Sequence, residues 1–270
     1  MTNDFRLKNY LARIGFEGAL EPKLATLTAL QTAHVDAIPF EGLDPLLKRP
    51  VRLDAASLQE KLVDSRRGGY CFEQNGLFKS ALEAIGFKVT GLGARVRWMS
   101  PPGSPLGPLE HMLLKVDLPE GPYLVDVGFG ACVIDAPLQL KPDIDQRTAM
   151  GTFRLAEDDG FFTLTARQPA EWRTAYVFNL SPQILADYEL GNWFTSTNPA
   201  APFPNMLIME RVGRDKRYKL INRRFVIEAR DGQLVAERLL GEPEELREVL
   251  DQTFNVTPPE SIEALFARLG

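Results

Sequence analysis

Cysteine and histidine are scarce in this sequence, which limits the chemistry that they can perform. The chain has two cysteines, Cys71 and Cys132, and two histidines, His34 and His111. Two cysteines make no disulfide framework, and none of these residues has the short C-x₂₋₄-C or H-x₃₋₅-H spacing of a zinc site. We therefore expect no metal, and a cysteine nucleophile with a histidine base is the chemistry to examine.

The segment around Cys71 has the features of a reactive thiol. Gly68 and Gly69 allow the backbone to turn sharply before a predicted helix whose first turn contains Cys71. The unpaired N–H groups and the positive end of the helix dipole favour a thiolate there, and Arg66 and Arg67 add positive charge. A free cysteine beside an apolar helix face is also commonly a small buried residue. This segment by itself leaves both interpretations open.

A cysteine nucleophile needs a base within hydrogen-bond reach and a third group that orients the base. His111 opens one predicted strand, and Asp126 ends the next one. If the intervening turn has its apex at Glu120-Gly121, Asp126 lies opposite Lys115. His111 then shares that face but lies four residues further along, roughly 13 Å away. Contact between the two side chains therefore requires an asymmetric loop or a bent strand.

The hydrophobic pattern changes at Gly86. Before it, apolar residues at three- and four-residue steps predict helices over residues 5–14, 24–37, from 54 onward, and 71–85. In the last of these, Glu73 and Gln74 are expected on the outer face. After Gly86, short β-rich runs separated by Pro, Gly and Asp predict a small antiparallel sheet or barrel, with strands over 89–97, 112–117, 123–127, 161–167 and 172–178.

The remainder of the chain alternates helix and strand. We expect a helix over 181–192 and two closing helices over 242–254 and 259–269. Between them lie predicted strands over 206–212, 217–221, 225–229 and 234–239. Because no repeat or flexible linker is visible, the predicted domains are expected to pack tightly on one another.

The composition excludes several classes of protein. The 270 residues are 44% hydrophobic and 25% charged, which argues against disorder, collagen and coiled coil. No stretch reaches the length of a membrane span, and the N-terminus MTNDFRLKNY lacks the apolar core of a signal peptide. A net charge of -5 argues against a general nucleic-acid binder. We therefore expect a cytoplasmic protein with no membrane or nucleic-acid partner.

Residues 67–75, RGGYCFEQN, resemble the RGGxCxExN signature of the arylamine N-acetyltransferases. Further segments are similar to that family and occur in the family's order, one before this motif at residues 34–41 and three after it at residues 110–112, 125–130 and 193–203. The resemblance covers roughly residues 5 to 205, and the rest of the chain carries no motif that we can match. One departure is Gly42, where the family pattern has asparagine, and we expect it to affect loop packing more than chemistry.

The resemblance implies an α+β, multi-domain fold with a cysteine-protease-like Cys-His-Asp core. It implies an N-terminal helical bundle over residues 1–86, which carries Cys71. An antiparallel β-barrel follows over 87–180 and carries His111 and Asp126. An interdomain helix and an α/β lid then occupy 181–270.

The resemblance also implies an acetyl-CoA-dependent reaction with ping-pong kinetics. Cys71 would accept the acetyl group, His111 would be its base and Asp126 the orienting carboxylate. The acceptor would be an arylamine, arylhydrazine or hydrazide. Under this interpretation His34 is structural and Cys132 is an inert thiol.

Further residues are assigned supporting roles. Glu41 and Arg67 are expected to form a buried ion pair that holds the cysteine loop. The resemblance places Phe40, Phe129 and Phe203 around the substrate, which agrees with the apolar pocket that a flat aromatic acceptor needs.

Two further features of the sequence concern contacts with CoA. Gly128 and Gly130 would let the backbone approach the cofactor. Residues 211–224 contain seven basic residues and one acid. This segment either attracts CoA phosphates or forms the solvated face of a hairpin.

Three alternative functions remain open from the sequence. The first is a CoA-independent amide synthase of the same fold, and the second is a papain- or transglutaminase-like cysteine hydrolase or amidase. The third is a non-catalytic binding protein in which Cys71 is inert.

Overall fold

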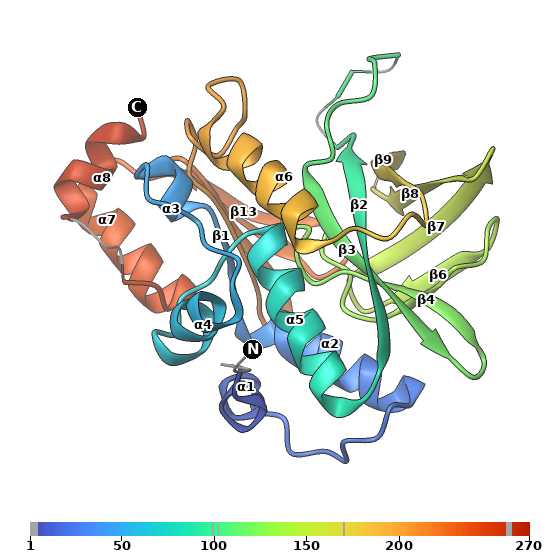
Figure 1. Cartoon of the computed structure of the whole chain (residues 1–270). Coiled ribbons are helices and arrows are strands. Elements are labelled where there is room, and N and C mark those ends of the chain that lie inside the picture. Colours follow the sequence, from blue (N-terminus) through green and yellow to red (C-terminus); the bar gives the residue numbers. More distant parts are fainter. Residues whose placement is uncertain (1–4, 99, 102, 170, 258–260) are drawn as a thin grey trace.

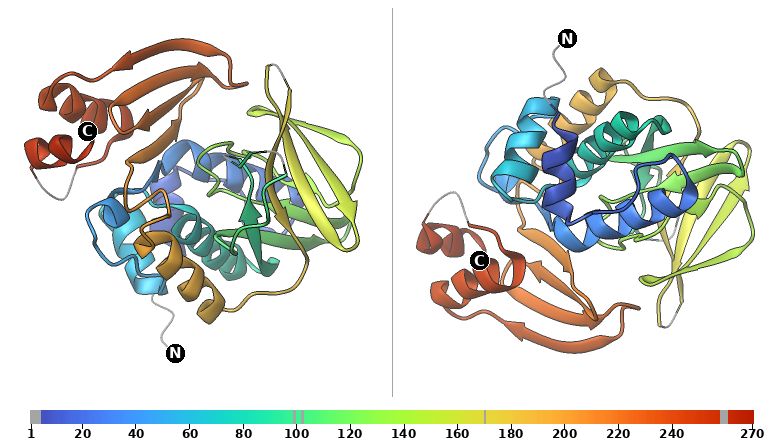
Figure 2. Two further views of the ribbon diagram at one scale, coloured as in Figure 1. Left: turned by 90° about the horizontal axis from the view of Figure 1, so that it is seen from above. Right: turned by 90° about the horizontal axis from the view of Figure 1, so that it is seen from below.

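The computed structural model describes residues 5–98, 100–101, 103–169, 171–257 and 261–270. Helices from the first part of the chain occupy the centre of the molecule (Figure 1), with an antiparallel sheet on one side and a second sheet with its own helices on the other. The two views of Figure 2 show the same three-part arrangement. The α+β class predicted from the sequence is confirmed.

The N-terminal helices begin and end where local sequence signals place them. Gly15 (φ +67°) ends the first helix in the left-handed conformation, and the second stops before Pro39. Asp54 caps the fourth by accepting a hydrogen bond from the Ser57 N–H at 2.9 Å. The elements of this part are α1 (Leu7–Ile14), α2 (Leu24–Ala37), β1 (Phe40–Glu41), α3 (Leu43–Leu46), α4 (Ala55–Leu58), the π-helical turn η1 (Gln59–Asp64) and α5 (Cys71–Ile85).

The predicted outer face of α5 is wrong at the start of the helix, because Glu73 and Gln74 are both buried. Helix α5 is surrounded by other elements (Figure 1), including α4 and strand β3, which packs along it. Polar residues in its first turns therefore face protein, and they remain stable there only because each is hydrogen-bonded or ion-paired.

The barrel predicted after Gly86 is an eight-stranded antiparallel sheet in the order β5-β4-β3-β2-β9-β8-β7-β6. The sequence predicted five of these strands and missed β5, β6 and β7. The first two are short, and β6 (DQRT) has no apolar alternation to mark it. The strands are β2 (Lys88–Val96), β3 (His111–Leu118), β4 (Gly121–Val125), β5 (Leu138–Gln139), β6 (Asp145–Thr148), β7 (Gly151–Asp158), β8 (Phe161–Arg167) and β9 (Trp172–Phe178).

A side chain joins the two edge strands of this sheet. Gln146 on β6 accepts a hydrogen bond from the Gln139 N–H at 2.7 Å and donates one to the Gln139 carbonyl at 2.9 Å. The amide thus takes the place of a backbone pair and nearly closes the barrel, which protects edges that would otherwise be open to pairing with other chains.

The C-terminal part forms a second antiparallel sheet in the order β1-β10-β11-β12-β13. Its helices cover one face, where Leu220 and Phe225 pack with Leu250 and Phe254. The elements are α6 (Leu185–Thr197), β10 (Ile208–Val212), β11 (Lys216–Ile221), β12 (Arg224–Ala229), β13 (Leu234–Leu239), α7 (Pro243–Glu248), the π-helical turn η2 (Val249–Phe254) and α8 (Ile262–Arg268).

Helix α6 starts later than the predicted position 181. The Gln183 N–H donates to the Gly91 carbonyl at 2.9 Å, which holds the preceding residues in extended form against β2. Asp187 then caps the helix by accepting a hydrogen bond from the Ile184 N–H at 2.9 Å.

One hydrophobic cluster joins the N-terminal helices to β3 and β4, a second fills the interior of the barrel, and a third packs against the C-terminal sheet. We propose residues 86 and 180 as domain boundaries, because α5 ends before the first and the last barrel strand, β9, ends before the second. The first cluster and the pairing of β1 with β10 cross these boundaries. Among the residues that the structure describes, no helix has the length and apolar character needed to cross a membrane.

Replacing Gln146 with alanine should loosen the barrel seam, because it removes both hydrogen bonds between β5 and β6. We expect faster amide hydrogen exchange in these two strands and a loss of about 1 kcal/mol of stability. Gln168→Ala is the matched control, since that side-chain amide donates to the carbonyl of its neighbour Arg167 and not to β5 or β6. Unchanged exchange in β5 and β6 would show that the seam is held by other contacts.

Candidate active site

Cys71 is the first residue of α5, and the loop before it is closely packed. A Cβ atom on Gly68 would lie 2.1 Å from the Pro39 carbonyl oxygen, and one on Gly69 would lie 2.8 Å from the Glu73 carboxylate. The Tyr70 N–H donates to that carboxylate at 3.1 Å and caps the helix. The two glycines are therefore required because the loop passes too close to its neighbours to carry side chains.

The structure brings Cys71, His111 and Asp126 together. The His111 Nε2 atom lies 2.7 Å from Asp126 Oδ2, and the Cys71 side chain interacts with the same imidazole. The Cys71 Sγ atom lies 3.6 Å from the carbonyl oxygen of Glu110, the residue before His111. The order of groups is thus sulfur, imidazole, carboxylate.

The register that allows this contact differs from the predicted one. Leu118 pairs with Gly121 and Lys115 pairs with Leu124, so the turn has its apex one residue earlier than expected. Asp126 is thereby two residues closer to His111 along β3. Because a shift of two residues keeps every side chain on its original face, Asp126 still points toward His111.

Asp126 is fully buried and accepts four hydrogen bonds. Besides His111, the donors are the Asn75 amide at 2.9 Å, the Gly128 N–H at 2.9 Å and the Tyr176 hydroxyl at 3.0 Å. Burial alone would raise the pKa of this carboxyl, but His111, the Asn75 amide and the Gly128 N–H hold it below its ordinary value. Asp126 is therefore an oriented carboxylate.

His111 is charged at neutral pH. Its burial opposes the charge, but the attraction of Asp126 and the hydrogen bonds to Asp126 and Cys71 raise the pKa of His111 to about 10.

Cys71 and His111 open into an apolar cavity of about 250 Å³. The three predicted phenylalanines, Phe40, Phe129 and Phe203, all line it. The Phe129 ring meets the His111 ring edge-on, with 5.1 Å between the ring centroids. The centroids of the Phe203 and Phe40 rings are 6.0 Å apart. Further lining residues include Val96, Trp98, Ala131, Thr195, Pro202 and Ile208.

Glycines shape this cavity in ways that the sequence did not reveal. A Cβ on Gly128 would lie 2.7 Å from Cys71 Cα, and one on Gly130 would lie 2.5 Å from the Phe40 ring. A Cβ on Gly42 would lie 2.8 Å from the Phe203 ring. Packing against protein thus accounts for all three, and a cofactor role for Gly128 and Gly130 stays a prediction.

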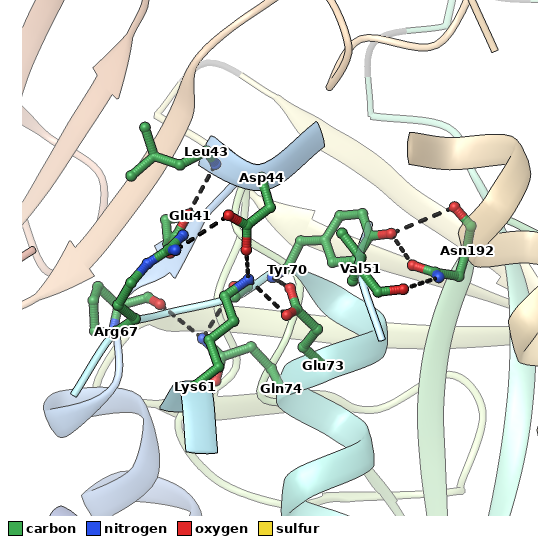
Figure 3. Close-up of polar contacts among 12 residues, drawn as sticks. Glu41, Leu43, Asp44, Val51, Lys61, Arg67, Tyr70, Glu73, Gln74 and Asn192 are labelled. Carbon is green, nitrogen blue, oxygen red and sulfur yellow. Dashed lines mark hydrogen bonds and ion pairs between the residues drawn. The ribbon is translucent and has the colours of Figure 1, made fainter. Parts of the chain in front are cut away.

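A buried network of charges lies behind the cysteine loop (Figure 3). The predicted contact of Arg67 with Glu41 is present, with Nε 2.9 Å from Oε1. Arg67 also contacts Asp44 at 3.1 Å, and Lys61 bridges Asp44 and Glu73 at 2.6 Å each. The sequence analysis did not identify Asp44 and Lys61, because nothing in their spacing marks them.

On the other side of Tyr70, the network is extended by neutral groups. The Tyr70 hydroxyl donates to the side-chain oxygen of Asn192 on α6, whose amide donates to the Val51 carbonyl at 2.9 Å. Figure 3 shows these contacts on the opposite side of Tyr70 from Lys61. The loop before Cys71 is therefore held by both the helical part and α6.

His34 and Cys132 lie outside the cavity. His34 contacts the Tyr10 hydroxyl at 2.9 Å and the Gln74 side-chain oxygen at 2.7 Å. Burial lowers the pKa of His34 to about 4, so it is neutral. Burial raises the pKa of Cys132 to about 12, so it is a thiol.

The basic segment 211–224 is only partly solvated. Its hairpin turns between Val212 and Arg217, but Arg217 is buried and its guanidinium lies 2.9 Å from Glu228. Lys219 pairs with the same carboxylate at 2.8 Å. Among the described residues, no group of three or more His, Cys, Asp or Glu side chains is placed to hold a metal ion.

The sequence analysis also missed Tyr176 and assigned no role to Asn75. Asn75 lies within the motif around Cys71, one helical turn after it, and this spacing could have suggested that its side chain reaches the same site. Tyr176 lies within an apolar strand on a distant part of the chain, and no local signal distinguishes it from a core residue.

Substituting asparagine for Asp126 should change how stability depends on pH. An unfolded histidine loses its proton near pH 6.5, whereas folded His111 keeps it to about pH 10. The folded state therefore gains stability from the tighter binding of this proton. That contribution is complete below about pH 6.5 and is lost as the pH rises through about 10. In Asp126→Asn the pKa of His111 falls, so urea unfolding should show a smaller decrease in stability over this range than in the wild type.

Asp117→Asn is the matched control, because Asp117 also lies in the barrel but pairs with Lys115 and Lys88. Equal pH slopes for the wild type and Asp126→Asn would contradict the raised pKa of His111.

Comparisons with known proteins agree with this geometry. Residues 23–261 match the family model described as N-acetyltransferase. An arylamine N-acetyltransferase of Mycolicibacterium smegmatis is 43% identical over 82% of this chain and 82% of its own, and one of Escherichia coli is 38% identical over 93% and 88%. The structure of the Mycobacterium marinum arylamine N-acetyltransferase in complex with CoA superposes with a TM-score of 0.92 at 38% identity, covering 98% of each chain. The chain therefore belongs to the arylamine N-acetyltransferase family.

Proposed function

We propose that this protein transfers the acetyl group of acetyl-CoA to the nitrogen of an arylamine, arylhydrazine or hydrazide, through an acetyl thioester on Cys71. The observation that carries the proposal is His111, which contacts both Cys71 and Asp126 beside an apolar cavity. Membership of the family supports it, and so does the M. marinum relative that was solved with CoA.

In the first half-reaction, the Cys71 thiolate attacks the carbonyl carbon of acetyl-CoA. The bond from that carbon to the CoA sulfur then breaks, and CoA leaves as a thiolate that takes up a proton from the His111 imidazolium. The backbone N–H groups in the first turn of α5 are the proposed donors to the oxyanion. Because the product is again a thioester, the acetyl-enzyme is close in energy to acetyl-CoA.

In the second half-reaction, the amine nitrogen attacks the acetyl carbon, and the Cys71 sulfur leaves as a thiolate. His111 accepts the proton that the amine loses, which restores the starting ion pair. Asp126 does not exchange protons in this scheme. It keeps the imidazole oriented and stabilises its charge.

The cavity favours an aromatic acceptor for a physical reason. Aromatic amines are neutral near pH 7 and keep a free lone pair, whereas alkylamines are protonated, and burial of a charged amine beside Phe129 and Phe203 would be costly. The Thr195 hydroxyl lines the cavity, is buried, and has no hydrogen-bond partner among the described residues. We propose that it hydrogen-bonds a polar atom of the bound substrate.

The backbone at Gly128 and Gly130 is the proposed path of the cofactor toward the sulfur. Both residues line the cavity beside Cys71 and present no side chain. The supporting role proposed for Glu41 and Arg67 is to hold the loop before Cys71, which their ion pair adjoins.

Incubation with acetyl-CoA alone should add one acetyl group to Cys71, which intact-mass and peptide mass spectrometry can locate. Cys71→Ser should show no acetyl group at that position, and Cys132→Ser is the matched control that should react like the wild type. Absence of an acetyl-enzyme in the wild type would favour the CoA-independent amide synthase. Rapid loss of the acetyl group to water, unaffected by an aromatic amine, would favour the hydrolase.

Phe203→Ala should weaken the reaction with aromatic acceptors, because it removes an aromatic wall of the cavity. We expect kcat/KM for an arylamine to fall about tenfold, corresponding to about 1.4 kcal/mol. Phe161→Ala is the control, since Phe161 is an exposed phenylalanine on β8 away from the cavity. Equal steady-state constants for Phe203→Ala and the wild type would exclude Phe203 from the acceptor site.

A further inference from the structure

A second cavity, of about 340 Å³, lies behind the cysteine loop and shares no lining residue with the active-site cavity. It is bounded by the C-terminal ends of α1 and α2, by Pro39, by strand β10 and by the residues that follow η2. Unlike the active-site cavity, its lining is mostly polar. We call it the arginine pocket, because Arg13, Arg66 and Arg211 all line it.

The three guanidinium groups come from segments far apart in the sequence. Arg13 is at the end of α1, Arg66 directly precedes the ion-paired Arg67, and Arg211 lies on β10. Within the described parts of the chain, none of the three is ion-paired with a carboxylate, and no lining residue is acidic. Three like charges thus converge on one polar cavity in a protein whose net charge is -5.

Arg13 is fixed in place by the backbone. It donates to the carbonyl oxygens of Leu62 at 3.0 Å, Ala37 at 2.8 Å and Arg66 at 3.3 Å. These carbonyl dipoles bind its donors and offset part of its positive charge, but within the described residues no carboxylate pairs with it. Burial, together with the nearby charges of Arg66 and Arg211, lowers the pKa of Arg13 to about 10, so it remains a cation at neutral pH.

The other two arginines are more accessible and remain available for a ligand. Arg66 is exposed, and its backbone has a left-handed conformation (φ +54°), which is uncommon for a side chain of this size. Arg211 is half-buried and donates to the Thr253 carbonyl at 2.5 Å. One buried and two accessible guanidinium groups around a cavity form a site for an anion, since planar guanidinium groups bind oxyanions with paired hydrogen bonds.

We propose that the arginine pocket binds a small phosphorylated metabolite through Arg13, Arg66 and Arg211. Three positive charges match a multivalent oxyanion better than a single carboxylate. The volume is at the lower end of the range for small-molecule sites, about 300 to 1,000 Å³, and exceeds what a bare ion needs. This site is separate from the proposed acetyl transfer and does not depend on it.

The test is calorimetric titration of the full-length protein with inorganic pyrophosphate, with ionic strength kept constant by sodium chloride. The wild type should show saturable binding. Arg66→Gln and Arg211→Gln should each raise the Kd at least about tenfold, the effect of one lost charge-assisted hydrogen bond. Arg214→Gln is the matched control, because Arg214 is an exposed arginine of the same basic segment that does not line the pocket, and it should bind like the wild type.

Titrations with citrate and with CoA test whether the pocket prefers phosphate over carboxylate groups and whether it is part of the CoA site. Tighter binding of pyrophosphate than of citrate, unaffected by saturating CoA, supports a phosphorylated ligand at a separate site. Three results would overturn the proposal: no saturable binding by the wild type, equal Kd values for the two pocket variants and the control, or displacement of pyrophosphate by CoA. Tighter binding of citrate would overturn the assignment to a phosphate. Circular dichroism of each variant shows whether it is folded, and either pocket variant is sufficient for the test.

Discussion

The buried carboxylate of Asp126 is the constraint on which the site depends. An unpaired charge at this depth would cost several kcal/mol, so the fold must supply donors, and it draws them from different elements. Asn75 comes from α5, His111 from β3 and Tyr176 from β9, while Gly128 lies in the loop after β4. Satisfying one carboxylate therefore fixes the helical part against the barrel, and the same contacts orient the imidazole toward Cys71.

The second constraint is the network behind the cysteine loop. Arg67 and Lys61 face three carboxylates, those of Glu41, Asp44 and Glu73. Removing one partner of such a cluster leaves a buried charge uncompensated, which is more damaging than the loss of a surface ion pair. Because Glu73 also caps α5, the network determines where the helix begins and hence where the sulfur is located.

The active-site cavity is assembled from all three parts of the molecule. Phe40 comes from the short strand that joins the C-terminal sheet, Phe129 from the loop after β4, and Phe203 from the segment after α6. Gly42 and Gly130 allow the rings of Phe203 and Phe40 to approach. The departure from the family pattern at Gly42 thus bears on the shape of the cavity, since a side chain there would displace Phe203.

Local features of the sequence were sufficient to predict the longer N-terminal helices and the position of Cys71 at the start of α5. A capping aspartate and the glycines at positions 15 and 86 act over a few residues, so their effects can be read without the fold. The contact between His111 and Asp126 could not be derived in this way. It depends on a turn apex that is one residue from the expected place, and a pairing register is chosen by the packing of whole strands. Burial of Glu73, the donor role of Tyr176 and the convergence of three arginines likewise arise only when distant segments meet. The sequence alone determined the candidate reactive groups and the helix that carries Cys71, whereas the tertiary structure decided which groups touch, because contact between distant segments is set by packing and by the need to pair buried charges.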